Sequence, residues 1–256
     1  MKKLNKGFTL VELLVVIGIL GVLMGTLFPA ITGAMRTANM TACMQNGKNL
    51  HTAIFTRNTA RDSLGLGSVW PQNGQTESSE DDDISAMSFN NSADYFTELF
   101  DLANAGDSQN HKPEIEVDMK LLWGFGVNPP RAGTTKFEAR NILWAIAANI
   151  PDNAPDFVPV LASRNINCSK LLNKMSTSSS TEIGLGSNGG STYDTPFSSK
   201  GCVYITRGGG AVKVDNSRDF IYRVVYSQKF DLTSTSSDQG AFCYLTPDSK
   251  ATPTSN

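Results

Sequence analysis

The sequence is poor in the residues on which most enzyme and metal sites depend. Its two histidines are His51 and His111, so a Ser-His-Asp device or a multi-histidine metal site would have to use one of them. The four cysteines show no C-x-x-C spacing, which argues against a zinc-thiolate site. Basic residues number 22 against 24 acidic ones, so nucleic acid is not the default partner. These shortages favour a structural or binding role, with an exported hydrolase as an alternative that would need one of the two histidines.

Long apolar runs are also scarce, and the prominent one stands at the start of the chain. Residues 8–31 carry one charge, Glu12, and as a helix they would span roughly 36 Å, enough to cross a bilayer. Three lysines precede the run and the next basic residue is Arg36, which predicts a cytoplasmic leader and an exported body: Lys2, Lys3, Lys6. A carboxylate in hydrocarbon costs roughly 2.5–3.5 kcal/mol, so Glu12 needs a partner.

The junction between leader and apolar run carries a specific motif. It reads Gly7-Phe8-Thr9-Leu10-Val11-Glu12-Leu13, and Pro29 lies near the end of the run. From Lys2 to about Pro29 the chain resembles the prepilin, or type IV pilin-like, family. The resemblance implies that a membrane-embedded prepilin peptidase cuts after Gly7 and methylates the new terminus at Phe8. An ordinary secretory signal would instead place its cleavage site after the apolar run.

Assembly roles follow for several residues of the same segment. The resemblance implies that Glu12 pairs with the Phe8 terminus of a neighbouring subunit, which would neutralise both charges. Gly18, Gly21 and Gly25 fall near one helical face, where small residues let helices approach closely in lipid. The alternative is that these glycines are merely tolerated weak spots. Pro29 removes one intrahelical hydrogen bond and is expected to bend the helix.

Beyond Pro29 the helix is expected to continue to about residue 61. Its inward face is predicted from three- and four-residue spacing: Ile31, Met35, Ala38, Ala42, Asn46, Leu50 and Ile54. The predicted organisation is a leader (1–7), a transmembrane part (8–31), an amphipathic continuation (32–61) and an exported globular α+β domain (62–256). The fold class is α+β and pilin-like, with a long N-terminal helix packed on a small antiparallel β-sheet domain.

Within the body, the clearest signal is a β-hairpin around the turn Arg207-Gly-Gly-Gly210. A helix is predicted from a cap at Ser92 to about Ala105, with Phe96, Leu99, Phe100 and Ala103 inward and Gly106 as its stop. Residues 156–163 read as a strand that Pro159 confines to an edge or a bulge. The remaining expectations are a buried strand or short helix at 141–149 and strands at 220–226 and 241–245.

Two further groups of residues are candidate sites. Cys202 and Cys243 both look like strand residues late in the chain, which favours a disulfide between them over the other pairings; buried thiols are the alternative. Two acidic stretches could hold calcium, although a solvated charge run and a turn are the simpler interpretations: Asp81, Asp82, Asp83, Asp215 and Asp219. No other cofactor is expected.

The functional prediction is a non-enzymatic structural subunit of the bacterial inner membrane. It would cross the bilayer once, use an inner-membrane assembly platform and join other pilin-like subunits. The resulting filament would be a type IV pilus or the pseudopilus of a type II secretion system. The alternative is a membrane-tethered periplasmic binding module that uses the prepilin segment as an anchor. That module would have a ligand cleft in its body and would not depend on Glu12.

Overall fold

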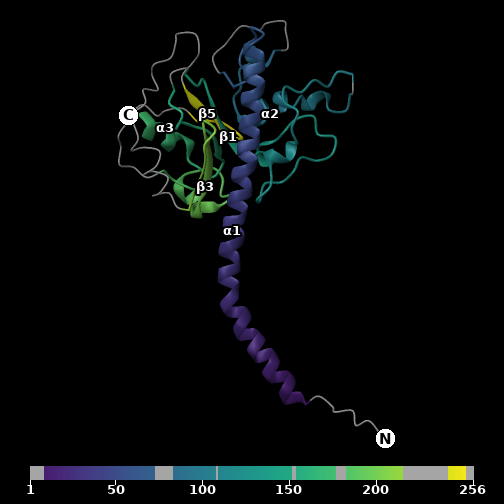
Figure 1. Cartoon of the computed structure of the whole chain (residues 1–256), viewed down its shortest axis with the longest axis vertical. Coiled ribbons are helices and arrows are strands. Elements are labelled where there is room, and N and C mark those ends of the chain that lie inside the picture. Colours follow the sequence, from purple (N-terminus) through teal and green to yellow (C-terminus); the bar gives the residue numbers. More distant parts are fainter. Residues whose placement is uncertain are drawn as a thin grey trace. The chain divides into compact units, whose positions relative to one another are not determined.

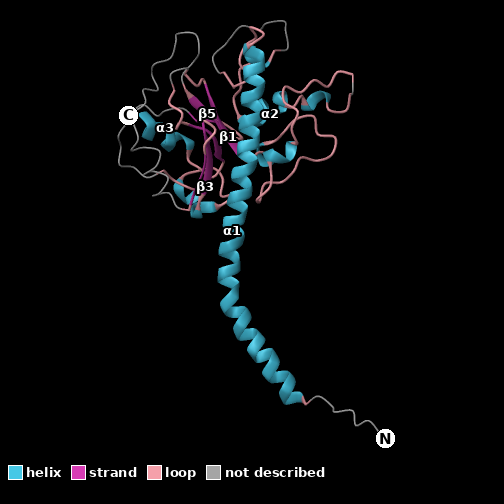
Figure 2. Ribbon diagram, in the orientation of Figure 1, coloured by secondary structure: helices cyan, strands magenta, loops and turns pink. Residues whose placement is uncertain are grey.

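The computed structural model of the chain describes residues 9–72, 83–107, 109–151, 154–176, 183–215 and 242–251. Within these ranges the α-helices are α1 (Leu10–Asp62), α2 (Ser92–Leu99) and α3 (Cys168–Ser176) (Figures 1 and 2). The strands are β1 (Trp144–Ala148), β2 (Pro159–Ser163), β3 (Cys202–Thr206), β4 (Ala211–Val214), β5 (Cys243–Leu245) and β6 (Lys250–Ala251). Short 3-10 turns are η1 (Ile84–Ala86), η2 (Leu102–Asn104), η3 (Met119–Leu122), η4 (Ala139–Asn141), η5 (Ser187–Gly189) and η6 (Ser198–Lys200).

Helix α1 belongs to two compact units, of which the first is Met1–Asn39 and the second Met40–Asn256. The helix continues through Pro29 and ends at Asp62, one residue beyond the predicted end. Its end is set by Gly65, which has a φ of +70°. This left-handed conformation suits glycine, and the N–H of Leu66 then bonds the carbonyl of Arg61 at 3.0 Å.

The six strands form one antiparallel sheet in the order β4-β3-β2-β1-β5-β6. Strands β3 and β4 are the predicted hairpin, β1 confirms the strand interpretation of residues 141–149, and β5 lies in the predicted 241–245 segment. Residues 220–226 lie outside the described residues. The α+β prediction of a long helix on a small antiparallel sheet is therefore confirmed.

Pro159 does not mark an edge strand, and that part of the prediction is wrong. Strand β2 lies between β1 and β3 in the interior of the sheet. Pro159 is the first residue of the strand, and the register to β3 shifts between Pro159 and Leu161. The bulge alternative is confirmed, because a shift at the strand start lets proline sit in an interior strand without the N–H that it lacks.

The sheet is covered on both faces, which explains why all five residues of β1 and of β2 are buried. One face meets residues 40–62 of α1 together with α2, in a core that includes Leu50, Phe96 and Trp144. The other face meets α3. The prediction contained no such helix, although Cys168, Leu171, Leu172 and Met175 recur at helical spacing and all are buried.

The buried face of α1 differs from the predicted one. Its members are Met40, Cys43, Gly47, Leu50, His51, Ile54 and Arg61. Leu50 and Ile54 were predicted, whereas Ala42 is exposed and Gly47 is buried. A Cβ at Gly47 would lie 2.6 Å from Cη2 of Trp144 and 2.9 Å from Cγ1 of Ile205. The helix lies tightly against Trp144 and Ile205 of the sheet at a residue without a side chain, which a hydrophobic pattern does not detect.

Helix α2 is shorter than predicted. Its N-cap is Asn91, whose side chain accepts the backbone N–H of Asp94 at 2.8 Å, while Ser92 is the first helical residue. The helix ends at Leu99, because Asp101 adopts a left-handed conformation with φ 45° and ψ 49°. Ala103, predicted to face inward, is exposed on the following 3-10 turn. The inward positions of Phe96, Leu99 and Phe100 are confirmed.

Candidate processing and assembly segment

Glu12 lies in the first turn of α1 and is bonded to Thr9 of its own chain. Its Oε2 accepts the backbone N–H of Thr9 at 2.9 Å and the Thr9 hydroxyl at 2.7 Å. The Thr9 hydroxyl oxygen in turn accepts the N–H of Glu12 at 3.3 Å. This reciprocal pattern is that of a capping box, and it gives the carboxylate two donors at the end of the helix where a negative charge is favoured. The sequence prediction did not anticipate the role of Thr9.

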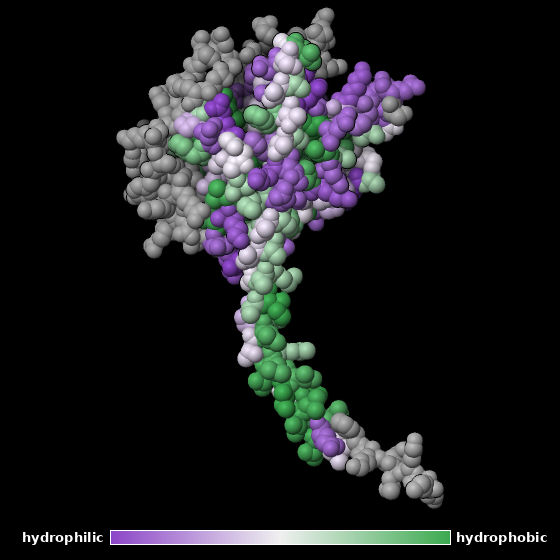
Figure 3. Space-filling view, viewed as in Figure 1, coloured by the Kyte–Doolittle hydropathy of each residue, from purple (hydrophilic) through white to green (hydrophobic). Residues whose placement is uncertain are grey.

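The first part of α1, residues 10–31, exposes a long row of large apolar side chains. Figure 3 shows this part of α1 as a continuous hydrophobic surface. Leu10 is 79% exposed, and Val22 and Phe28 are each 70% exposed. In the part of the chain that the structure describes, α1 is the one helix long and apolar enough to cross a membrane. Such a surface requires lipid or other apolar side chains around it.

The glycines of this segment present open positions. A Cβ added at Gly18, Gly21 or Gly25 would meet no atom of this chain within 4 Å. Nearby, the Thr32 hydroxyl donates to the carbonyl of Pro29 at 2.9 Å within the same helix. The proposed packing role of the three glycines and Pro29 therefore concerns contacts beyond this single chain, and it stays a prediction.

Gly7 and Phe8, the predicted cleavage and methylation residues, lie outside the described residues. Residues 2–28 match the prokaryotic N-terminal methylation motif. Together with the apolar helix that follows, this match supports processing at a prepilin-type terminus. The match covers residues 2–28 of the 256-residue chain, and it supports a prepilin-type, pilin-like terminus. No curated protein and no solved structure matches it significantly.

The N-terminal motif has implications for how the protein is processed and where it is anchored. The motif implies processing by a prepilin peptidase and assembly with pilin-like subunits. Together with the apolar helix it fits a protein anchored in the inner membrane.

The predicted disulfide between Cys202 and Cys243 is wrong, because all four cysteines are thiols. Cys202 begins β3 and Cys243 begins β5, and two strands separate β3 from β5. Three strand spacings amount to about 14 Å, whereas disulfide-bonded residues have Cα atoms within about 7 Å. Burial raises the pKa of Cys43, Cys168 and Cys202 and keeps these thiols protonated.

One of the acidic calcium candidates is engaged by an arginine. Arg61 at the end of α1 donates from Nη2 to both carboxylate oxygens of Asp83, at 2.5 and 2.7 Å. Burial would raise the pKa of Asp83, but hydrogen bonds from Arg61 and Ser85 outweigh it and lower the pKa. Asp81, Asp82 and Asp219 lie outside the described residues. Among the described ones, no group of three or more His, Cys, Asp or Glu residues could hold a metal.

Arg61 is the centre of a larger charged cluster that the sequence did not reveal. It is 4% exposed, and its Nη1 lies 3.2 Å from Glu114, which also binds Arg57 at 2.8 Å. Its Nε donates to the carbonyl of Gly67 at 2.8 Å. These contacts join the end of α1 to three separate segments. Because Glu114 is 53 residues from Arg61, no local pattern could have paired them.

The two histidines are held by different parts of the body. Nε2 of His51 lies 3.1 Å from the carbonyl oxygen of Arg207 in the β3–β4 turn. His111 Nδ1 lies 3.1 Å from the carbonyl oxygen of Asp101 and 3.4 Å from its carboxylate. Burial lowers the pKa of His51, and the bond to Arg207 opposes that shift. Each histidine therefore has a structural contact that accounts for its position without a catalytic role.

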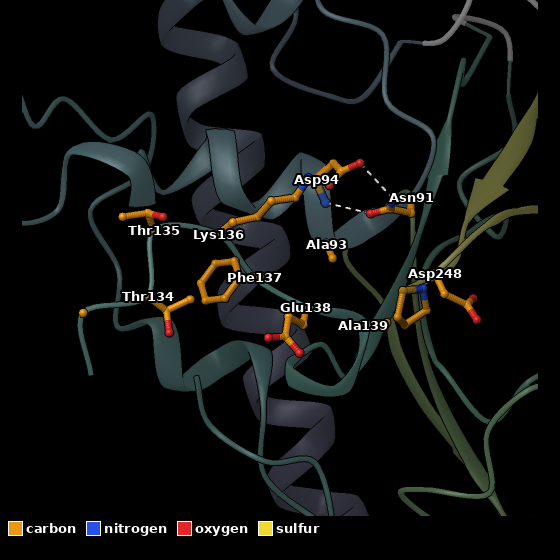
Figure 4. Close-up of a pocket in the computed structure, with 12 residues that line it drawn as sticks. Asn91, Ala93, Asp94, Thr134, Thr135, Lys136, Phe137, Glu138, Ala139 and Asp248 are labelled. Atoms are coloured by element: carbon orange, nitrogen blue, oxygen red, sulfur yellow. Dashed lines mark hydrogen bonds and ion pairs between the residues drawn. The ribbon is translucent and has the colours of Figure 1, made fainter. Parts of the chain in front are cut away.

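A cleft of about 560 Å³ lies between the start of α2 and residues 133–139 (Figure 4). Lys136 points toward Asp94, and its Nζ lies 2.8 Å from the carboxylate. Asn91 donates to the same carboxylate at 2.8 Å. These polar groups are bonded to one another and cap α2, so they form a structural arrangement at the wall of the cleft.

Proposed function

We propose that this protein is a filament subunit, cut after Gly7, methylated at Phe8 and polymerised through the N-terminal part of α1. The filament would be a type IV pilus or a type II secretion pseudopilus. The observation that carries the proposal is the apolar surface of residues 10–31, interrupted by one acid. Its exposure in the isolated chain means that lipid before assembly, and neighbouring helices after it, must surround these side chains.

The charge of Glu12 makes docking to another subunit favourable. Before docking, Thr9 supplies the two hydrogen bonds to its carboxylate. Cleavage after Gly7 would create an amino group at Phe8, a cation near neutral pH. Pairing between Glu12 of one subunit and that amino group of another neutralises two charges inside a low-dielectric bundle. A subunit therefore gains this pairing only next to another subunit.

Intact-mass measurement and N-terminal sequencing test the processing step. The protein is extracted from membranes of cells with and without the prepilin peptidase. A terminus at methylated Phe8, lost in the peptidase-free cells, is the expected result. A retained Met1, or a cut after residue 31, would contradict the proposal.

The binding-module alternative is favoured by the clefts of the body, and filament imaging distinguishes it. A subunit of a filament should be found in filaments that antibodies to the body decorate. A tethered module would be processed in the same way yet stay in the membrane fraction.

A further inference from the structure

A cleft of about 390 Å³ lies beside the C-terminal part of α1, and we name it the His51 cleft. Helix α1 contributes His51, Phe55, Asn58 and Asp62 to its lining. The other walls come from residues 68–72, the end of β1, β2 and the β3–β4 turn. The volume falls in the range of roughly 300–1,000 Å³ that is usual for small-molecule pockets.

Aromatic rings form one side of the His51 cleft. The ring of His51 stacks on Phe55, with centroids 6.1 Å apart and planes 11° from parallel. Trp70 lies against His51 from another direction, with centroids 5.8 Å apart. Phe55 is nevertheless 55% exposed. An aromatic face held in place and left open offers a stacking surface for a flat, partly apolar ligand.

Polar groups of both charge signs surround these rings. Asn58 is oriented by the backbone N–H of Val69, which its side-chain oxygen accepts at 3.0 Å. Asp62 and Arg207 bring one negative and one positive charge to the lining. His51 adds no charge at neutral pH, because burial favours its neutral ring. The His51 cleft therefore has no net charge, although it is rich in hydrogen-bonding groups.

The walls of the cleft are preformed by backbone contacts. The N–H of Asn149, after β1, donates to the carbonyl of Pro71 at 3.0 Å. The N–H of Arg207 donates to the carbonyl of Val158 at 2.8 Å, and the Arg207 carbonyl accepts from His51. A ligand would find these segments already ordered, so binding would not have to supply the free energy of ordering them.

We propose that the His51 cleft binds a neutral saccharide, whose ring lies against Phe55 and Trp70 while its hydroxyls bond to Asn58 and Asp62. A sugar ring combines an apolar C–H face with many hydroxyl groups, as this lining requires. The opposite charges of Asp62 and Arg207 give an ion of either sign no net electrostatic gain to offset the loss of its hydration. This inference goes beyond the proposed filament role and does not depend on it.

Tryptophan fluorescence of the full-length protein tests the proposal, because Trp70 lies in the lining, whereas Trp123 lies outside it and Trp144 is fully buried. The protein is kept in a zwitterionic detergent without a sugar headgroup. It is titrated with glucose, galactose, N-acetylglucosamine, maltose and cellobiose, and with glucuronate and glucosamine as charged counterparts. We expect a saturable change in fluorescence with at least one neutral sugar. Binding of the charged sugars should be at least tenfold weaker. No saturation with any neutral sugar, or equal binding of charged ones, would overturn the proposal.

A matched pair of variants places the binding in the cleft. Phe55→Ala removes a stacking ring and should weaken binding about tenfold, equal to about 1.4 kcal/mol. Leu64→Ala removes a comparably exposed apolar side chain outside the lining and should leave binding unchanged. Near-UV circular dichroism checks the fold, and Asp62→Ala serves as a second test if Phe55→Ala is misfolded. Wild-type affinity in a folded Phe55→Ala or Asp62→Ala variant would refute the assignment.

Discussion

The more hydrophobic part of α1 exposes its side chains, whereas the more polar part buries some of its own. Residues 10–31 are almost entirely apolar, yet their large side chains are exposed, with Leu10 at 79%. Residues 40–62 are more polar, and yet they bury Leu50 and Ile54 completely. Burial in a folded chain depends on what packs against a helix. The apolar part is therefore adapted to surroundings outside the chain, and the polar part to the body of the same chain.

The largest effect is expected from Glu12→Ala, which removes the charge of the apolar part. Membrane insertion should persist, while assembled filaments should fall at least about 100-fold, because the Phe8 amino group of the neighbouring subunit is left as an unpaired buried charge, which costs roughly 3–5 kcal/mol. Filament yield from sheared cells measures this. Glu116→Ala removes an exposed acid of the body and is the control. Wild-type filament yield from Glu12→Ala would show that the apolar part of α1 does not use its charge for contacts with other subunits.

Arg61→Met tests the polar part of α1. It leaves Asp83 and Glu114 without their buried cation, and the free energy of unfolding of the body should fall by about 3 kcal/mol. Arg57→Met also removes an arginine from Glu114, but Arg57 is 39% exposed, so a loss under about 1 kcal/mol is expected. Urea unfolding followed by near-UV circular dichroism gives both values. Equal losses would show that burial of Arg61 is not what matters.

Gly47→Ala tests the close approach between helix and sheet. The new Cβ would fall 2.6 Å from Trp144, so the body should lose about 1–3 kcal/mol through overpacking. Gly33→Ala in the same helix meets no atom of the chain within 4 Å and should leave the unfolding of the body nearly unchanged. A stabilised Gly47→Ala protein would mean that Trp144 can move aside at little cost.

The smallest expected effect concerns His51 and pH. Its pKa is lowered in the folded protein, so the unfolded chain takes up the proton first as the pH falls. Stability should be complete above about pH 6.5 and decline below it. The decline should be smaller in His51→Gln, which keeps a side-chain donor for the Arg207 carbonyl but does not titrate. Identical pH profiles from pH 7 to pH 5 would contradict the assignment to His51.

The sequence predicted those features that depend on local patterns. Neighbouring residues determine three such features: the apolar run, the glycine-rich hairpin turn before β4 and the end of α1 near Asp62. The buried face of α1 was predicted only at Leu50 and Ile54, because the packing surface is centred on Gly47, a residue without hydrophobic signal. The order of the strands in the sheet places Cys202 far from Cys243. That order cannot be derived from the spacing of residues in the sequence.

The candidate sites show the same division. Gly7, Phe8 and Glu12 belong to one contiguous motif, so a single segment was enough to predict roles for them. The Arg61 cluster and the His51 cleft bring together residues from several segments. Asp83 and Arg207 acquire their partners only through the fold, which explains why the sequence left Asp83 as a calcium candidate or part of a solvated charge run and did not single out Arg207.

The pairing of β1 with β5 has a consequence for the time course of synthesis. Ala148 pairs with Cys243, about 95 residues later in the chain. At 5–20 residues per second the ribosome needs about 5–20 s to make the intervening segment. During that interval β1, with its apolar sequence Trp-Ala-Ile-Ala-Ala, has one edge that its eventual neighbour cannot yet cover. A nascent strand of this kind is prone to pair with other chains, so correct folding depends on shielding it until β5 has been made.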